Sequence, residues 1–310
     1  MSEPIIRVDN VTKTFEMGGG FGKKETFQAL RGISFDLHAG KTLALVGESG
    51  CGKSTVARLI TKVHDVTSGD ITFKGQSVGD IRSGAALRDY RSKVQMVFQD
   101  PFGSLNPAHT IGHHLARPVE IHNRVSGKVA LLERQKELLE LVELDVDCLK
   151  KFPHQLSGGQ RQRINLARAL GVGAEMILAD EPTSMLDVSI RLGVLNLMQR
   201  MKSEMGIGFL YITHDLATAH YIAEETAVMY RGQIVEWGNT RDILTNPQHP
   251  YTKLLISAVP DPDLPFSEVV KESSQYSQDA ESIRLLSGKL QPEINQVSGN
   301  HFVRNWESAA

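Results

Sequence analysis

The stretch GESGCGKST at residues 47–55 has the residue types and the spacing needed to hold a phosphate chain. Its glycines let the backbone curl so that N–H groups point at phosphate oxygens, which a Cβ would block. Lys53 supplies a positive charge for the outer phosphates, and the Ser54 hydroxyl is a candidate Mg²⁺ ligand. The residues predicted to form this nucleotide site are Gly47, Glu48, Ser49, Gly50, Cys51, Gly52, Lys53, Ser54 and Thr55.

Two adjacent acids, Asp180 and Glu181, end the apolar stretch MILADE. Asp180 is the candidate carboxylate for Mg²⁺, a hard cation that is bound by oxygen ligands and water. Glu181 is the candidate general base for an attacking water. Adjacent acids at the end of a strand can also be ordinary surface residues. Their combination with a phosphate-binding loop favours the catalytic interpretation.

A second stretch, LSGGQRQRINLARAL at residues 156–170, begins like a helix that faces an anion. Ser157 and Gln160 fit the S-x-x-Q capping box of a helix N-terminus. Gly158 and Gly159 have no side chains that could cover the N-terminus of that helix, so that its N–H groups can face an anion. Taken alone, the pattern fits a well-capped helix without a ligand equally well.

The elements around these motifs predict an α/β core with a helical block in its middle. Apolar runs that read as strands lead into the phosphate-binding loop, into the two acids and into His214. Residues 101–172 change to helices with polar connections, of which residues 130–144 are the clearest. Strands are also expected at residues 5–15 and 94–100, a loop at 18–25, and a hairpin over 227–238 that turns at Arg231–Gly232. Residues 260–282 are polar and rich in proline, which is typical of a linker or a weakly ordered tail.

The composition excludes several classes of protein. The chain has 310 residues, 41% of them hydrophobic, and a formal net charge of -2, which disfavours a nucleic-acid-binding protein. No apolar run approaches the roughly 20 residues that span a bilayer, and MSEPIIRVDN lacks a signal-peptide core. We therefore expect the chain to stay in the cytoplasm. Its two cysteines, Cys51 and Cys148, do not form a metal-type pair.

The motif LSGGQRQR, together with the phosphate-binding loop and ILADEP, resembles the ATP-binding cassette (ABC) family, whose signature is LSGGQ. The resemblance implies a P-loop NTPase fold, with a RecA-like core, an antiparallel β subdomain and an inserted helical subdomain. In that family two cassettes pack head to tail, so that the signature of one binds the γ-phosphate of the ATP held by the other. This implies that residues 157–160 serve the partner's nucleotide, and that a monomer cannot assemble a complete site.

The resemblance also assigns roles to single residues. Gln99 matches the Q-loop, which touches Mg²⁺ and the transmembrane partner, and Asp187 in SMLD matches the D-loop. His214 matches the switch histidine that contacts the γ-phosphate and Glu181. Phe15 is our choice for the aromatic residue that stacks on adenine, with Phe27 as the alternative. The implied catalytic residues are Glu181, His214 and Gln99, and the implied Mg²⁺ ligands are Ser54, Gln99 and Asp180.

Two longer stretches resemble the oligopeptide/dipeptide importer subfamily: FQDPFGSLNP at 98–107 and NPQHPYTKLLISAVPDPD at 246–263. They predict an ATP-binding domain over residues 1–260, with its helical subdomain at about 101–172, and a partly flexible C-terminal extension over 261–310. The implied partners are a second cassette, more often a different chain than a copy, two transmembrane permeases and, indirectly, a solute-binding protein. The protein would then lie on the cytoplasmic face of the inner or plasma membrane.

Three alternatives stay open at this point. Members of the subfamily also import oligosaccharides, such as β-linked disaccharides, or nickel, and the cassette itself never touches the substrate. The third alternative is an ABC ATPase that works without a permease.

The tail departs from the subfamily's pattern. Many members end in a motif like SGCRFHPRC, whose cysteines help to hold an iron–sulfur cluster. Here the matching stretch is SGNHFVRNW, with Asn300 and Trp306 at the cysteine positions. An amide and an indole cannot replace thiolate ligands, so we expect no cluster in this subunit.

Overall fold

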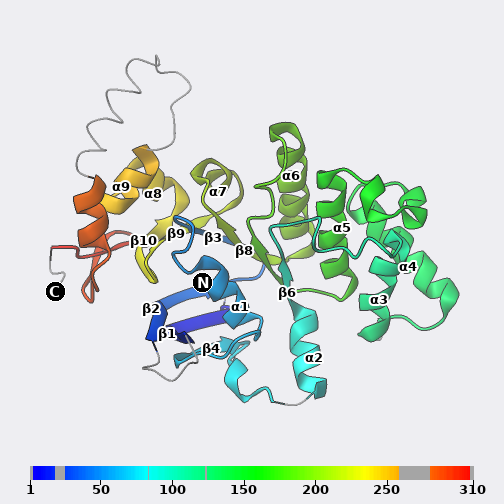
Figure 1. The fold of residues 1–310 in the computed structure, drawn as a ribbon, viewed down its shortest axis with the longest axis horizontal. Helices are drawn as coiled ribbons and strands as arrows, with labels where there is room; N and C mark the ends of the chain where they lie inside the picture. Colours follow the sequence, from blue (N-terminus) through cyan, green and yellow to red (C-terminus); the bar gives the residue numbers. More distant parts are fainter. Residues whose placement is uncertain (1–2, 18–24, 83, 123, 258–279, 308–310) are drawn as a thin grey trace.

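The computed structural model describes residues 3–17, 25–82, 84–122, 124–257 and 280–307. Two sheets organise them (Figure 1). The larger sheet has the strand order β11-β12-β10-β9-β3-β8-β7-β6, and the smaller one has the order β2-β1-β4-β5. The bounds of the smaller sheet are β1 Ile6–Met17, β2 Glu25–Leu37, β4 Ser68–Phe73 and β5 Gln76–Ser77.

The centre of the larger sheet is parallel and buried on both faces. Strands β3 (Thr42–Val46), β7 (Met176–Asp180) and β8 (Gly208–Thr213) are buried along their whole length, as expected of apolar parallel strands covered by helices. Strand β6 (Val94–Val97) pairs parallel with β7, and β9 (Glu225–Tyr230) pairs parallel with β3. The carboxyl ends of these strands therefore meet at one edge, where ligands of open α/β sheets bind.

Helices surround the sheets and fill the middle of the chain. The long helix α6 (Val188–Met205) connects β7 to β8, and α1 (Lys53–Ile60) follows β3. One core cluster joins α1 to both sheets, with Ile33, Leu45 and Ile212 among its members. The short helices are α2 Gly84–Lys93, α7 Leu216–Ile222, α8 Thr240–Thr245, η1 Val78–Asp80, η2 Val146–Lys150 and η3 Pro153–Gln155.

The helical block expected over residues 101–172 is confirmed. It contains α3 (Ile111–Ile121), α4 (Lys128–Leu141) and α5 (Gly158–Gly171), which lie together at the right of Figure 1. Fully buried Leu115 and Leu138 pack in one cluster with residues of α5 and α6. The block therefore shares its core with the helix that follows the two acids.

The C-terminal region adds to the larger sheet. The predicted hairpin is confirmed as β9 and β10 (Gln233–Asn239), with Arg231 and Gly232 at the turn. After α9 (Pro250–Ser257), residues 280–287 form a helix, and β11 (Ile294–Ser298) pairs with β12 (His301–Arg304). Strand β12 also pairs with β10, so this second hairpin, which we did not predict, extends the sheet.

Three expectations concern residues that the structure describes only in part. Residues 18–24 of the expected loop and 260–279 of the expected linker lie outside the described residues; Glu25 already belongs to β2, and residues 280–282 are helical, which differs from both expectations. The division of the chain into a cassette, residues 1–260, and an extension, residues 261–310, stays a prediction. Among the described residues, no helix is long and apolar enough to cross a lipid bilayer.

Candidate functional site

The phosphate-binding loop lies where the sequence predicts it, between the buried strand β3 and helix α1. Gly50 and Gly52 have φ values of +81° and +114°, a backbone region that favours glycine. The Lys53 side chain is buried, and its Nζ donates to the carbonyl oxygens of Gly47 at 2.6 Å and Glu48 at 2.9 Å. The loop thus curls around its own lysine and holds a positive charge at the start of α1.

Two residues of the loop have packing roles instead of facing the open cavity. A Cβ on Gly47 would lie 2.2 Å from the carbonyl oxygen of Met229 on β9, so only glycine fits there. The Cys51 side chain is buried, and burial raises the pKa of its thiol. Cys51 is therefore a small packing residue with low thiolate character.

The loop borders a cavity of about 650 Å³ that is also lined by residues of five other segments. These segments are the start of β2, the ends of β7 and β8, the residues after β6, and α9. The P-loop, the two acids, Gln99 and His214 therefore meet at one place, whereas the signature and Asp187 do not line this cavity. The residues lining this cavity are Phe27, Ala29, Glu48, Ser49, Gly50, Gly52, Lys53, Ser54, Thr55, Gln99, Asp180, Glu181, His214 and Leu255.

Glu181 is held on both sides of its carboxylate. His214 Nδ1 lies 3.1 Å from Glu181 Oε1, and Gln99 Nε2 donates to Glu181 Oε2 at 3.0 Å. The backbone of Glu181 has φ +46°, an uncommon left-handed conformation for a glutamate, and its N–H donates to the carbonyl of Ile212 at 2.9 Å. Such backbone strain clusters at functional sites, where the surrounding structure maintains it.

Asp180 occupies a different environment from its neighbour. It ends β7 with little exposed surface, and burial raises the pKa of its carboxyl, partly offset by a hydrogen bond with Ser54. A buried carboxylate without a full complement of partners is stabilised by a nearby cation. Asp180 and Ser54 therefore offer two oxygen ligands side by side within the cavity.

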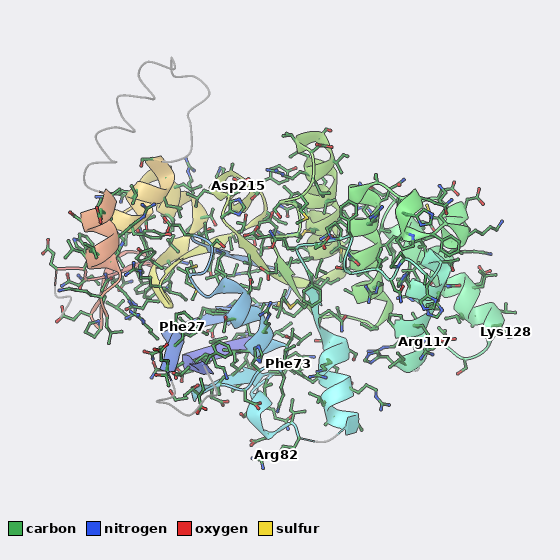
Figure 2. The ribbon with its side chains drawn as sticks, in the orientation of Figure 1. Phe27, Phe73, Arg82, Arg117, Lys128 and Asp215 are labelled. Atoms are coloured by element: carbon green, nitrogen blue, oxygen red, sulfur yellow. The ribbon has the colours of Figure 1, made fainter. Side chains whose placement is uncertain are left out.

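Of the two candidates for the adenine contact, Phe27 lines the cavity and Phe15, our first choice, does not; the choice between them stays a prediction. The two residues are opposite each other in the β1–β2 register. Phe27 lines the cavity and is half exposed, and Figure 2 shows it on β2. Phe15 instead packs edge-on against His64, with ring centroids 5.4 Å apart, and carries the Lys13 ammonium 5.0 Å from its ring centroid.

The signature forms the predicted capping box at the start of α5. Ser157 Oγ accepts from the Gln160 N–H at 3.3 Å, and Gln160 Oε1 accepts from the Ser157 N–H at 3.0 Å. Among the described residues that line the P-loop cavity, none comes from the signature. A Cβ on Gly159 would lie 2.2 Å from Ile190 Cγ2, so this glycine also allows α5 to pack against α6.

Two residues that sequence reasoning missed connect the D-loop to the segment of His214. Asp187 is the N-cap residue of α6 and makes no side-chain capping bond there. From the next turn, Arg191 Nη1 pairs with Asp215 at 3.2 Å, and Arg191 Nη2 donates to the carbonyl of Leu186 at 3.4 Å. Asp215, labelled in Figure 2, caps α7 directly after His214. Its N-cap position before a helix was the available sequence signal.

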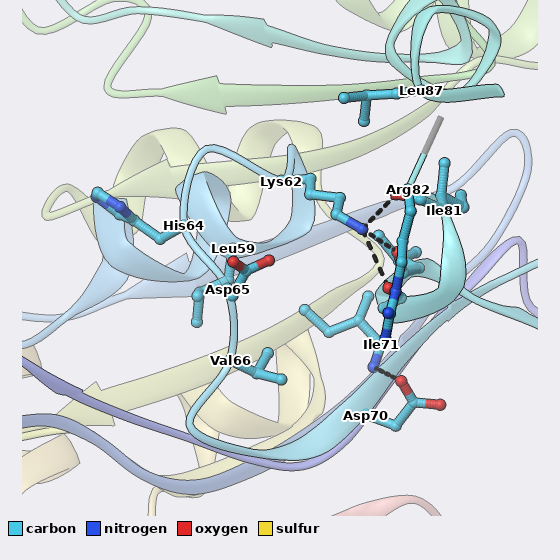
Figure 3. A pocket seen from close by; sticks show the side chains of 12 residues that line it. Leu59, Lys62, His64, Asp65, Val66, Asp70, Ile71, Ile81, Arg82 and Leu87 are labelled. Carbon is cyan, nitrogen blue, oxygen red and sulfur yellow. Dashed lines mark hydrogen bonds between the residues drawn. The ribbon is translucent and has the colours of Figure 1, made fainter. Parts of the chain in front are cut away.

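A second cavity, of about 530 Å³, lies beside the smaller sheet (Figure 3). Its lysine, Lys62, donates to the carbonyl oxygens of Val78 at 2.7 Å and Ile81 at 2.6 Å, and more weakly to that of Gly79 at 3.3 Å. This lysine is therefore committed to the turn around η1. The P-loop cavity instead brings Lys53 together with the candidate base Glu181 and the oxygen ligands of Ser54 and Asp180.

Comparisons with known proteins agree with this geometry. The ABC transporter family matches residues 30–184, and the family described as the oligopeptide/dipeptide transporter C-terminal region matches residues 235–282. The oligopeptide transport ATP-binding protein OppF of Bacillus subtilis is 41% identical over 303 residues, 98% of this chain and 96% of that protein. The dipeptide transport ATP-binding protein DppF of Haemophilus influenzae is 45% identical over 83% of this chain and 78% of its own length.

A solved structure shows the same fold. The cassette MJ0796, in a dimeric post-hydrolysis state with ADP and phosphate, has a TM-score of 0.67 and 29% identity. The similarity covers 76% of this chain and 99% of that cassette. The P-loop, the two acids and the signature lie within the matched part of a chain that resembles curated transport ATP-binding proteins along nearly its full length. This chain belongs to the ABC transporter family.

Proposed function

We propose that this chain is the ATP-hydrolysing subunit that energises a peptide importer. The observation that carries the proposal is the arrangement of Glu181, held between Gln99 and His214 at the edge of a P-loop cavity. The names of OppF and DppF, proteins that transport oligopeptides and dipeptides, support the substrate class.

The residues divide the reaction between binding and proton transfer. The P-loop N–H groups and Lys53 bind the phosphates, and Phe27 offers its ring to the base. Glu181 takes a proton from the water whose oxygen attacks the γ-phosphorus. The bond from the γ-phosphorus to the bridging oxygen breaks, which leaves ADP and phosphate. His214 and Gln99 keep the carboxylate of Glu181 in place, so that the base is oriented before the water arrives.

Three side chains suit a magnesium ion. The Ser54 hydroxyl and the buried Asp180 carboxylate lie side by side, and Gln99 keeps its amide oxygen free of the bonds that its Nε2 makes. Oxygen donors of this kind are what the ion prefers. When bound, Mg²⁺ would neutralise charge on the phosphates.

The signature is proposed to act on a second cassette. It does not line the P-loop cavity of its own chain. Its helix has a capping box at the N-terminus and begins with two glycines, which have no side chain to cover the first N–H groups, so a phosphate could approach them. The dimeric state of the related cassette supports this arrangement. Asp187 would lie in the same interface. We favour a different chain over a copy as the partner, with ATP closing the pair because it binds the closed state more tightly.

The remaining partners follow from the importer. Two permeases would hold the cassettes at the cytoplasmic face of the membrane, and a solute-binding protein would deliver the peptide outside. The C-terminal tail does not suit an iron–sulfur cluster. Asn300 donates through Nδ2 to Glu225 at 3.1 Å, and Trp306 packs edge-on against His249, so both cysteine positions have other structural roles.

Uptake by reconstituted vesicles tests the function. Vesicles holding both cassettes, the permeases and the binding protein should import labelled dipeptides or oligopeptides when ATP is supplied on the cassette side. The Lys53→Ala variant should bind ATP weakly and import little. ATP-driven uptake of a β-linked disaccharide or Ni²⁺ without peptide uptake would overturn the substrate class. Recovery of the chain from cells in a complex that contains no membrane protein would overturn the importer.

A further inference from the structure

The first residue after Gly47 in the P-loop is held by a helix from the C-terminal region. The N–H of Glu48 donates to the hydroxyl of Tyr251 on α9 at 3.1 Å. Tyr251 is fully buried and packs on Tyr230 of β9, with ring centroids 4.2 Å apart. The hydroxyl is therefore held in place by its surroundings, and it satisfies a backbone donor where the loop leaves β3.

The side chain of the same P-loop residue is held by a second C-terminal segment. Arg284, in the helix formed by residues 280–287, pairs through Nη2 with Glu48 Oε1 at 3.0 Å. The end of that helix is fixed to the cassette because Gly288 accepts from Arg31 Nη1 at 2.9 Å and Lys289 accepts from Gln233 Nε2 at 2.8 Å. These two hydrogen bonds therefore hold the helix that carries Arg284 in place beside the P-loop.

The charge of Glu48 makes this pairing matter for a nucleotide. Its carboxylate lines the same cavity as Lys53, so it repels the phosphates of ATP. Arg284 offsets that repulsion, while Leu255 of α9 lines the cavity beside Phe27 and Glu48. Three residues beyond position 250 therefore act on the nucleotide cavity.

We propose that Tyr251 and Arg284 are positioning residues through which the C-terminal region sets the affinity of the P-loop for ATP. Tyr251 fixes the backbone of Glu48, and Arg284 cancels its charge. The proposal rests on the proposed ATPase function of this cavity. It goes beyond that function because it makes nucleotide affinity depend on a region outside the ATP-binding motifs.

A double-mutant cycle between Arg284 and Glu48 tests the electrostatic part. The dissociation constant for a fluorescent ATP analogue is measured at low and high salt for the full chain, Arg284→Gln, Glu48→Gln and the double variant. Arg284→Gln should weaken binding about two- to fivefold at low salt and less at high salt. In the Glu48→Gln background the same change should have little effect. Equal losses in both backgrounds, or no loss in either, would overturn the charge-cancelling role.

The hydroxyl of Tyr251 is tested by a change that keeps the ring. Tyr251→Phe leaves the Glu48 N–H without its acceptor and should raise the KM for ATP about three- to tenfold with kcat at saturating ATP nearly unchanged. Tyr221→Phe, which removes a hydroxyl bonded to Asn196 between α7 and α6, is the matched control and should leave both constants unchanged.

The outcomes separate the two proposals. If the unaltered chain binds and hydrolyses ATP but Tyr251→Phe behaves like Tyr221→Phe, the positioning role of Tyr251 is wrong and the ATPase function stands. If the unaltered chain fails to bind ATP, the proposed function itself fails. Thermal unfolding of each variant, followed by circular dichroism, shows whether a loss of binding comes from a loss of fold.

Discussion

The carboxylate of Glu181 has two neighbours and an unusual backbone. His214 and Gln99 each engage one of its oxygens, and its φ of +46° aims it into the cavity from the end of β7. Asp180, one residue earlier, is buried and paired with Ser54 instead. The two adjacent acids thus lie in different environments, which supports the different roles that we propose for them.

Replacing the base tests this assignment. Glu181→Gln keeps the shape of the side chain but cannot take a proton, so ATP hydrolysis by the assembled complex should fall about 10²- to 10⁴-fold. ATP should still bind, and size-exclusion chromatography should show an ATP-trapped pair of cassettes. Glu204→Gln, which alters an exposed residue of α6, should leave turnover unchanged. Normal turnover in Glu181→Gln would exclude Glu181 as the base.

The choice between two aromatic residues gives a second prediction at this scale. Phe27 lines the nucleotide cavity, whereas Phe15 packs on His64. Phe27→Ala should therefore weaken the binding of ATP about three- to thirtyfold through loss of stacking and apolar contact, and Phe15→Ala should change it much less. The measurement is the dissociation constant of the two variants side by side. The reverse order would restore Phe15 as the adenine contact.

Among the elements, α5 joins the signature to the core through a close helix contact. A Cβ on Gly159 would lie 2.2 Å from Ile190 Cγ2, so Gly159→Ala should force α5 and α6 apart and lower the free energy of unfolding by about 1–3 kcal/mol. Urea unfolding measures this loss. The matched control is Gly84→Ala in α2, where an added Cβ meets nothing within 4 Å. Equal stability of the two variants would show that the contact yields without strain.

In the C-terminal elements, the buried His249 should make the free energy of unfolding depend on pH. Burial lowers the pKa of His249 from 6.5 to about 4, although the Gln291 side chain and the nearby Glu236 partly oppose the shift. Between pH 4 and pH 6.5 the unfolded chain therefore binds more protons at this residue, and the free energy of unfolding falls as the pH is lowered through that window. Above pH 6.5 His249 is neutral in both the folded and the unfolded chain, so it causes no loss of stability there.

Unfolding by urea at pH 7.5 and pH 5.5 measures that slope. The His249→Gln variant should lose less stability between the two pH values than the unaltered chain does. His154→Gln, which alters an exposed histidine, should keep the full slope. The neighbouring pair of His301 and Glu236, 2.7 Å apart and fully buried, is present in all three proteins, so the comparison isolates His249. Equal slopes for His249→Gln and the unaltered chain would contradict the assignment.

For the molecule as a whole, the sequence predicted best what depends on short stretches. The P-loop, the acids after β7, the capping box of α5 and the turn at Arg231–Gly232 each rest on a few neighbouring residues, and all four are present. The helical block was visible because its apolar residues recur at helical spacing. These features need no knowledge of distant partners.

What the sequence did not predict depends on contacts between distant segments. The β11–β12 hairpin joins β10 across some sixty residues, although the Gly299–Asn300 turn was a usable hairpin signal. Phe15 and Phe27 are opposite each other in the β1–β2 register, so spacing along the sequence does not show that Phe27 lines the cavity and Phe15 does not. The contacts of Tyr251 and Arg284 with Glu48 span about 200 residues or more and have no local pattern.

The central claim is that this chain drives import as one subunit of a membrane complex. The most direct measurement is a pull-down of the tagged full-length chain from its native membranes in a gentle detergent, followed by mass spectrometry. The account predicts the recovery of two permeases, a second cassette and a solute-binding protein whose binding of peptides can then be measured. Recovery of a complex that contains no membrane protein would contradict it and leave only the ATPase chemistry.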